Sequence, residues 1–437
     1  MLKFENSAST FMEFRVKMTL IYMSINLTPV FKVKKKHTIQ DLLKNHFRQY
    51  LKDPLRKLYL EPRHFEAVNK IKVCQSSKIG YFVFVCTDCG EVKEVHRSCK
   101  HRFCPTCGIA DTYKWAEQTL SRLMNIKHHH ITMTLPKPLR ELSKMNGDKL
   151  HNILFKSSAK ILKEWFEHRH NLRPGIVSVL HTAGADLKYH PHVHMIVSAG
   201  GQDLSTGKYR TLKNAFLVKQ RFLGTQLKLK FGQALFEAYN NGELKMHTKI
   251  KDPAQLKKWF RNTSDKHWIV SIQDPLDDVE QIVKYVGRYT KRACVSEYKI
   301  ENIDHKHVDL KYNDYKNTPR GEKPKEAIIR FTKTEFLDRL LQHVPTKRYR
   351  AVRYYGQYCS HYLNKIPLHL KLSARLELKD IQFDDAYDWG VFEAYRKNLL
   401  KLGKQDPLVC PHCQKDYILY GVFYDDPKKN VIFYEDP

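Results

Sequence analysis

The sequence predicts an α+β protein in which an antiparallel sheet is flanked by helices. Apolar residues recur at helical spacing in segments such as "TIQDLLKNHFRQYL" (38–51), whereas "GIVSVLHTAG" (175–184) and "HPHVHMIVSAG" (190–200) are short apolar runs typical of strands. A polar turn joins these two runs, which favours antiparallel pairing of neighbours. The 437 residues, 42% of them hydrophobic, are sufficient for several domains with substantial cores.

The same patterns predict the order of elements and four regions. After helices over 38–72 we expect a strand at 78–86, a helix at 109–124, a strand at 128–136, a helix at 147–169, the two strands named above, helices at 211–240 and 253–260, a strand at 267–273, a helix from Pro275, strands or loops over 301–330, and a helix at 332–344. We divide the chain into an extension without stable structure (1–37), a helical cysteine-rich domain (38–118), a mixed α and β domain (119–300) and a basic C-terminal α/β region (301–437).

The charge of the chain indicates a polyanionic partner. Lys and Arg number 76 against 46 Asp and Glu, a net charge of +30. Such a charge opposes compaction by self-repulsion unless a polyanion neutralises it. Basic residues are interleaved with aromatic ones, as in "YRAVRYYG" (349–356), where the tyrosines could stack on bases or pack in a core. Nucleic acid is therefore favoured over a basic protein without an acidic ligand. No run of about 18 uncharged apolar residues predicts a membrane span.

The cysteines indicate metal binding in a reducing compartment rather than disulfides. The stretch "CTDCGEVKEVHRSCKHRFCPTCG" (86–108) contains two CxxC pairs at the spacing of a zinc ribbon or treble clef. We expect Cys86, Cys89, Cys104 and Cys107 to hold one structural Zn²⁺ ion as four thiolates. Alternative ligands, which leave room for a second ion, are Cys99, His101, His96 and Cys74.

A further CxxC pair, Cys410 and Cys413, lies near the end of the chain without an obvious second pair. Cys359 and His361 are the candidates to complete it.

Three histidines alternate in the strand predicted at 190–200. His190, His192 and His194 therefore project from one face. Two neutral imidazoles beside an open coordination position can hold a divalent ion against a substrate, and His181 on the preceding strand strengthens this interpretation. Imidazole also suits Zn²⁺, so the ligands do not name the ion. For a Mg²⁺ or Mn²⁺ site, the candidates for a third ligand are Asp186, His190 and Gln281.

The segment "QDPLDDVEQIVKYVGRYTKR" (273–292) predicts a helix that carries two candidate nucleophiles. Tyr285 and Tyr289 are four residues apart and lie on one flank of an apolar stripe. Taken alone they fit core packing, but beside a histidine strand in a basic chain they favour chemistry. A tyrosine oxygen can attack a phosphodiester and form a covalent phosphotyrosine. Four neighbouring basic residues would favour the phenolate and bind the DNA backbone: Lys284, Arg288, Lys291 and Arg292.

These motifs resemble the HUH endonuclease superfamily, named for its His-hydrophobic-His motif, here His192-Val193-His194. More narrowly, the chain is similar to the two-tyrosine transposases of rolling-circle insertion sequences. The zinc cluster ending "SCKHRFCPTC", the strands "ITMTLP" and "HPHVH", and "YVGRYTKR" follow one another in the same order as in that family. "RFTKTEFLDRLLQHV" and "YRAVRYYG" resemble its C-terminal region, so that the similarity extends over roughly 40–415.

The resemblance implies an HUH nuclease core within 119–300, an N-terminal zinc-binding domain that contacts DNA, and nicking of single-stranded DNA through a 5′-phosphotyrosine. Tyr285 and Tyr289 would be the nucleophiles, His192 and His194 the ligands of a catalytic Mg²⁺ or Mn²⁺, and no ATP would be needed. The partners would be single-stranded DNA, transposon ends and target DNA, in the bacterial cytoplasm near the nucleoid. A replication initiator of the same superfamily and a non-catalytic zinc-dependent DNA-binding regulator are the alternatives.

Overall fold

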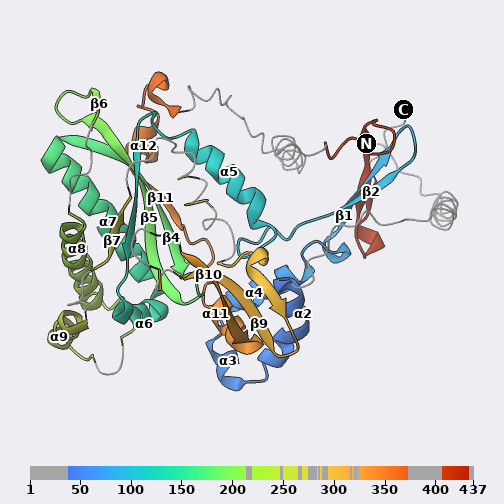
Figure 1. The fold of residues 1–437 in the computed structure, drawn as a ribbon, viewed down its shortest axis with the longest axis horizontal. Coiled ribbons are helices and arrows are strands. Elements are labelled where there is room, and N and C mark those ends of the chain that lie inside the picture. The colour runs from blue at the N-terminus through green and yellow to red at the C-terminus, as the bar shows by residue number, and fades with distance from the viewer. Residues whose placement is uncertain are drawn as a thin grey trace.

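The computed structural model is an α+β protein, which confirms the predicted fold class (Figure 1). It describes residues 38–212, 219–246, 250–263, 268–273, 283, 286–287, 294–314, 317–318, 322, 324–372 and 406–432. The predicted extension at 1–37 lies outside these residues. None of the described helices combines the length and the apolar character needed to cross a membrane.

The N-terminal helices pack against a distant part of the chain. Helices α2 (Ile39–Tyr50), α3 (Pro54–Tyr59) and α4 (Pro62–Val73) follow one another, and Thr38 caps α2 by accepting a hydrogen bond from the Asp41 amide. The apolar faces of α2 and α4 share a core with the three-stranded sheet β8 (Ile300–Ile303), β9 (His307–Asp314) and β10 (Lys325–Thr332), and with α11 (Lys333–Leu341). The Tyr50 hydroxyl donates to Asp338 across this contact at 2.7 Å.

The central sheet has six strands within the described residues, in the order β11–β4–β5–β3–β7, with β6 paired to β5. Every pairing is antiparallel. The strands are β3 (His128–Thr134), β4 (Leu172–Ala183), β5 (Tyr189–Asp203), β6 (Tyr209–Thr211), β7 (Val270–Ile272) and β11 (Val352–Gly356). Register places His181 opposite His192 on β4 and β5, and Thr132 opposite His194 on β3 and β5.

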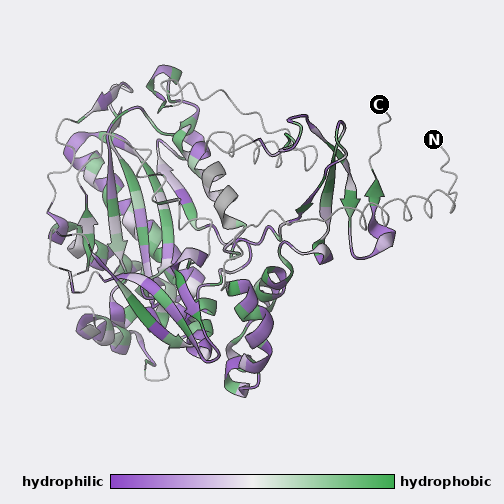
Figure 2. Cartoon of the chain, turned by 45° about the vertical axis from the view of Figure 1, so that its right-hand side comes forward, coloured by the Kyte–Doolittle hydropathy of each residue, from purple (hydrophilic) through white to green (hydrophobic). Residues whose placement is uncertain are grey.

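Helices cover both faces of this sheet. One face packs against α6 (Lys137–Met145), α7 (Gly147–His170) and α8 (Gln220–Asn240), and α9 (Pro253–Thr263) joins this layer through Phe260. The other face packs against α5 (Gly108–Leu120), α12 (Ser360–Leu363) and the helical residues Val283 and Val286. Figure 2 shows predominantly hydrophobic strands between helices whose outer faces are polar. The histidine face of β5 is therefore the face on α5 and Val286, since Ile196 belongs to the second set.

A separate four-stranded sheet joins the two ends of the described chain. The hairpin of β1 (Tyr81–Cys86) and β2 (Val92–His96) pairs through β1 with β12 (Tyr417–Phe423), which in turn pairs with β13 (Val431–Ile432). This sheet stands apart from the central sheet in Figure 1.

The C-terminal part of the chain does not form a domain that simply follows the others in sequence. The C-terminal region predicted at 301–437 contributes β8–β10 and α11 to the N-terminal helices, β11 to the central sheet and β12 to the N-terminal hairpin. The boundary drawn at residue 300 therefore separates segments that pack together. Sequence periodicity is local: it allowed strands or loops over 301–330, did not predict β11 or β12, and indicated no long-range partners.

Candidate metal centres and active site

Three histidines on two adjacent strands converge on one point. His181, His192 and His194 each offer a ring nitrogen, and these nitrogens all lie within 4.8 Å of one another. The ring centroids are 4.2 Å apart for His181 and His194 and 4.8 Å apart for His192 and His194. Strand alternation places His192 and His194 on one face, and cross-strand register adds His181. The arrangement is a preformed set of three nitrogen donors.

Hydrogen bonds fix which nitrogen of each ring on β5 carries a proton. Gln273 Oε1 lies 2.8 Å from His130 Nδ1, and His130 Nε2 lies 2.8 Å from His194 Nδ1. A neutral His130 that donates to Gln273 must accept from His194, which leaves Nε2 of His194 with its lone pair. His192 Nδ1 donates to the His190 carbonyl at 2.6 Å, so its Nε2 is also a lone-pair donor. Both rings thus have the tautomer that a metal ligand needs.

Burial keeps these rings neutral. It lowers the pKa of His181 and of His194 well below 6.5, and that of His192 to about 4. Mutual repulsion between the charged forms of the neighbouring histidines acts in the same direction. The cluster is therefore available as three neutral ligands at neutral pH.

Val286, which lies between the two candidate tyrosines in sequence, contacts this cluster. The His181 ring hydrogen-bonds the backbone of Val286, a contact that opposes the lowering of the His181 pKa. Val283 and Val286 are fully buried in the hydrophobic cluster around Trp115. Gly287 lies so close to Trp115 that a Cβ atom there would come within 2.9 Å of the indole ring. The predicted site residues on either side lie outside the described residues: Gln281, Lys284, Tyr285, Arg288, Tyr289, Lys291 and Arg292.

The structure groups His181, rather than the predicted candidates Asp186 and His190, with His192 and His194. Asp186 forms an ion pair with Lys188 and accepts a hydrogen bond from the Lys188 amide, and it is not part of the donor set. The His190 ring lies edge-on to His192 at 5.4 Å, also outside the set. The turn between β4 and β5 holds Asp186 away from the strand face, which local sequence distance did not indicate.

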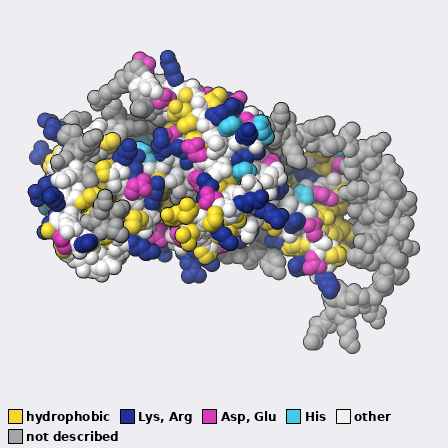
Figure 3. Space-filling view, turned by 90° about the horizontal axis from the view of Figure 1, so that it is seen from below, with side chains coloured by type: hydrophobic (Ala, Val, Ile, Leu, Met, Phe, Trp, Pro, Cys, Tyr) yellow, Lys and Arg dark blue, Asp and Glu magenta, His cyan; other side chains and the backbone are white. Residues whose placement is uncertain are grey.

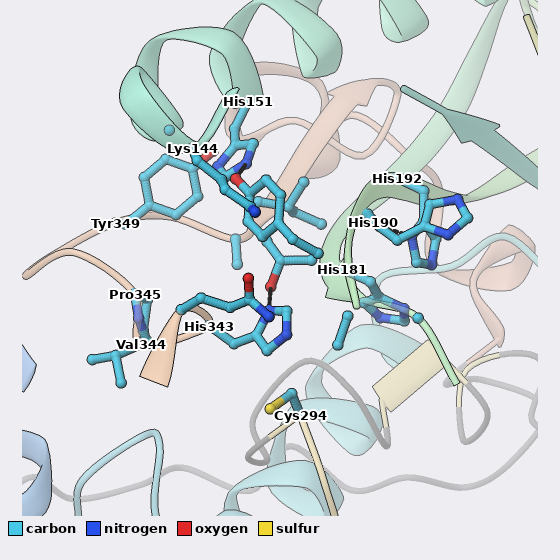
Figure 4. Close-up of a pocket in the computed structure, with 18 of the residues that line it drawn as sticks. Lys144, His151, His181, His190, His192, Cys294, His343, Val344, Pro345 and Tyr349 are labelled. Atoms are coloured by element: carbon cyan, nitrogen blue, oxygen red, sulfur yellow. Dashed lines mark hydrogen bonds between the residues drawn. The ribbon is translucent and has the colours of Figure 1, made fainter. Parts of the chain in front are cut away.

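The histidines line a cavity of about 1220 Å³ between the central sheet and the N-terminal unit. Figure 4 shows His181, His190 and His192 on one side of it and Lys144, His151 and Tyr349 on the other. Basic lining side chains outnumber the acidic ones by six to five. The basic ones are Arg63, Arg102, Lys144, Lys149, Lys245 and Lys299. Lys and Arg also spread over much of the described surface seen in Figure 3.

The cysteines form two clusters, and the predicted grouping is wrong. Cys104 and Cys107 lie with Cys74 and Cys99, and the Sγ of Cys74 is 3.5 Å from that of Cys107 and 3.6 Å from that of Cys104. Cys74 follows α4 directly, and Cys107 precedes α5, so both ends of the cluster are attached to helices.

The other predicted pair, Cys86 and Cys89, lies at the end of β1 together with Cys410 and Cys413. Two CxxC pairs with suitable spacing therefore belong to different clusters, because β1 and β2 carry the first pair away from the second. Of the alternatives, Cys74 and Cys99 are part of the first cluster and His101 is not; its Nδ1 accepts a hydrogen bond from the Phe103 amide. Cys359 and His361 do not join Cys410 and Cys413.

Some functional candidates were missed or underrated from sequence. His130 orients His194 from β3, and its place in "HHHITMT" at alternate positions with Thr132 and His128 was the available signal. The long-range pairing of Cys86 and Cys89 with Cys410 and Cys413 had only the matched CxxC spacing as a signal.

Comparisons with known proteins agree with the order of these features. Residues 42–135 match the family model described as "Transposase zinc-binding domain", and residues 175–365 match the one described as "Putative transposase". The first range includes the whole cluster of Cys74, Cys99, Cys104 and Cys107, and it supports Zn²⁺ as the structural ion there. The second includes the three histidines and both tyrosines.

Two curated relatives extend the similarity over most of the chain. "Putative transposase y4qJ" of Sinorhizobium fredii is 25% identical over 360 residues, which cover 81% of this chain and 88% of the relative. "Transposase for insertion sequence element IS801" of Pseudomonas savastanoi pv. phaseolicola is 28% identical over 319 residues, which cover 70% of this chain and 74% of the relative. The two matched regions follow one another in the order of the cysteine and histidine motifs, and over most of its length the chain is similar to transposases, one of them the transposase of an insertion sequence element.

Proposed function

We infer that the protein nicks and rejoins single-stranded DNA during rolling-circle transposition, through 5′-phosphotyrosine links on Tyr285 and Tyr289. The observation that carries this proposal is the hydrogen bond between His181 and the backbone of Val286. Val286 follows Tyr285 in the chain and precedes Tyr289 by three residues. Val286 is thereby joined to the histidine cluster, which supports the proposal that its neighbours Tyr285 and Tyr289 act there, although about ninety residues separate them from the histidines in sequence.

The reacting groups are a tyrosine hydroxyl of the protein and a phosphodiester and 3′ hydroxyl of the DNA. The phenol oxygen attacks the scissile phosphorus, the bond from phosphorus to the 3′ oxygen breaks, and that oxygen leaves as a 3′ hydroxyl after taking up a proton. The 5′ phosphate stays on the tyrosine. A 3′ hydroxyl of another strand can attack this phosphotyrosine in the reverse sense, so that joining requires no ATP. Two tyrosines allow two such links to exist in one protein.

His192, His194 and His181 are the residues that would hold a divalent ion, and their donor set fits one. Three neutral nitrogens leave coordination positions open for phosphate oxygens. A bound Mn²⁺ or Mg²⁺ would polarise the scissile phosphate and stabilise charge that develops on its oxygens. Because Mg²⁺ prefers oxygen ligands and imidazole suits later transition metals, we expect Mn²⁺ to support the reaction better than Mg²⁺.

The cavity beside the histidines is the proposed path of the DNA strand. Its wall combines lysines and arginines with Tyr349 and Tyr189, a composition suited to backbone phosphates and stacked bases. Binding should weaken with salt, with a log-log slope of about −0.7 for each phosphate neutralised on a single strand.

The test is covalent capture. Labelled single-stranded oligonucleotides tiled over the DNA that flanks the coding region are incubated with the protein and Mn²⁺, and adducts that survive denaturation are counted on a gel. We expect an adduct with one tile, reduced in each of Tyr285→Phe and Tyr289→Phe and absent in the double variant. Tyr298→Phe is the matched control, because that side chain is 66% exposed. Persistence of the adduct in the double variant would contradict the proposal, as would its absence from every tile.

A regulator without catalytic activity makes the opposite prediction. It would retain salt-sensitive DNA binding and form no adduct in any variant. The double tyrosine variant of the enzyme should still bind the tile that the unmodified protein cleaves, with an unchanged salt slope.

A further inference from the structure

Four cysteines from the two ends of the described chain form a site that the family matches cover only at Cys86 and Cys89. The Sγ atoms of Cys86, Cys89, Cys410 and Cys413 lie within 4.8 Å of one another. Cys410 and Cys413 fall outside the matched ranges 42–135 and 175–365. We propose that these four thiolates bind a Zn²⁺ ion of their own, which joins the C-terminal strand β12 to the N-terminal hairpin β1–β2 as one zinc ribbon.

The first cysteine loop has a backbone shaped for a metal. The amide of Cys86 donates to the Glu91 carbonyl at 2.9 Å, and the amide of Gly90 donates to the Cys86 carbonyl at 3.1 Å. Gly90 has φ of +72°, the left-handed conformation that reverses the chain after the second cysteine. These contacts fold the CxxC segment into a tight turn that directs both sulfurs to one side.

The second loop repeats this geometry. The amide of Cys410 donates to the Lys415 carbonyl at 2.7 Å, and the amide of Gln414 donates to the Cys410 carbonyl at 2.9 Å. Gln414 has φ of +64°, at the position that corresponds to Gly90. A residue other than glycine in this conformation is uncommon. Two segments of unrelated sequence therefore adopt one turn, each with its cysteines at the same places.

Backbone amides in both loops point at sulfur. The first cysteine of each pair, Cys86 or Cys410, accepts hydrogen bonds from the amides two and three residues later. Such amides stabilise a thiolate, which is the form of cysteine that binds metal.

The distances between the loops fit a tetrahedral ion. The Sγ atoms are 3.3 Å apart for Cys86 and Cys413 and 3.6 Å apart for Cys89 and Cys410. Four sulfurs at about 2.3 Å from Zn²⁺ would be separated by about 3.8 Å along the edges of a tetrahedron. A set of four thiolates without an open position is typical of a structural zinc site.

Among the described residues, the four-stranded sheet β13–β12–β1–β2 has only a small hydrophobic core. Its buried cluster consists of Phe84, Cys86, Cys410 and Tyr417. Besides the pairing of β1 with β12, the polar links between the two halves include a hydrogen bond from Lys93 Nζ to the Pro407 carbonyl and one from Arg97 to the Tyr424 hydroxyl. A core of this size rarely stabilises a module without a metal or disulfides.

Zinc content provides the first test. We expect two Zn²⁺ ions per chain by native mass spectrometry of the protein as purified under reducing conditions. Cys410→Ser/Cys413→Ser should retain one, Cys86→Ser/Cys89→Ser should retain one, and the combination of all four substitutions should also retain one. Cys359→Ser, at a cysteine outside both clusters, should retain two. An unchanged zinc content in Cys410→Ser/Cys413→Ser would overturn the proposal.

A cleavage experiment tests the link itself and does not depend on DNA cleavage. A protease site is inserted between residues 372 and 406 of the full chain, and the cut protein is passed over a sizing column. The C-terminal fragment should remain bound in the presence of Zn²⁺ and separate after treatment with a chelator under reducing conditions. Retention in chelator, or a thiol titration that finds these four cysteines oxidised as disulfides in the purified protein, would overturn zinc as the link.

Discussion

The histidine cluster and the cysteine clusters are both sets of metal-binding groups, but different structures hold them in place. The histidines belong to paired strands in the middle of the central sheet, with hydrophobic clusters on both faces. The cysteines occupy loops and helix ends, and at the cluster with Cys410 the buried residues other than cysteine are Phe84 and Tyr417. The sheet therefore positions the imidazoles whether or not an ion is bound, whereas we expect the cysteine modules to depend on bound ions for stability.

The largest expected effect is a loss of stability in the N-terminal helices that leaves the central sheet intact. Cys104 is 1% exposed within the first cysteine cluster, and Cys104→Ser should lower the free energy of unfolding of the N-terminal unit by about 4 kcal/mol or more through loss of its ion. Hydrogen exchange followed by mass spectrometry should show lost protection in α2 and α4 but retained protection in β4 and β5. Cys359→Ser should change neither. Equal loss of protection in β4 and β5 would show that the central sheet also depends on this zinc.

Acid should lower the stability of the central sheet and its helices through buried histidines. Burial lowers the pKa of His128, of His151 and of His343 to about 4. Each of these histidines takes up a proton near pH 6.5 in the unfolded chain but only near pH 4 in the folded chain. Its contribution to the free energy of unfolding is therefore fully present above pH 6.5 and is lost as the pH falls towards 4. Between pH 7 and 5 the loss should be about 2 kcal/mol for each histidine.

Urea unfolding at the two pH values, compared between the unmodified protein and His128→Gln, measures this contribution. The variant should be less stable at pH 7 because His128 hydrogen-bonds Tyr358 at 2.6 Å, but its stability should depend less on pH. An identical pH dependence in both proteins would contradict the assignment of a neutral buried imidazole.

A smaller effect is expected from the residue that orients a ligand. His130→Leu removes the acceptor that fixes the His194 tautomer. If the proposed site is correct, the rate of adduct formation should fall about tenfold and the Mn²⁺ concentration needed for half-maximal rate should rise. Gln273→Glu, which keeps an acceptor for His130 Nδ1, is the matched control and should retain most of the rate. A fall in rate without a change in Mn²⁺ dependence would argue against a role in orienting the ligand.

The smallest effect concerns the third-ligand candidate predicted from sequence. Asp186→Asn breaks a partly exposed ion pair with Lys188, whose worth is about 1 kcal/mol or less. Adduct formation should stay within about fivefold of the unmodified protein, whereas His181→Ala should reduce it much further. The reverse order would restore Asp186 as a ligand and remove His181.

Local features of this protein could be predicted from sequence, and long-range ones could not. The helix at 147–169 and the strands at 175–184 and 190–200 lie where periodicity placed them, because apolar spacing reflects a local geometry. The alternation of His192 and His194 similarly specified their common face. These predictions needed no knowledge of neighbours in space.

Contacts between residues that are distant in sequence had no comparable pattern in the sequence to predict them. The register of two strands gave His181 its position opposite His192, and a one-residue slip would have turned it to the other face. Cys86 and Cys89 were assigned to the nearest CxxC pair in sequence, while the fold supplied a pair more than three hundred residues away. The tyrosines, predicted as nucleophiles, remain predictions that the adduct assay would test.

Because β1 pairs with β12, the four-stranded sheet can assemble only late in synthesis of the chain. The ribosome releases the hairpin β1–β2 early, yet 321 residues separate Cys89 from Cys410. At 5–20 residues per second the hairpin waits roughly 15–60 s for its partner, and a two-stranded hairpin is marginally stable by itself. A nascent or truncated chain that stops before β12 therefore exposes unpaired strand edges, which chaperones and proteases can recognise. Assembly of this module thus shows that translation has passed β12.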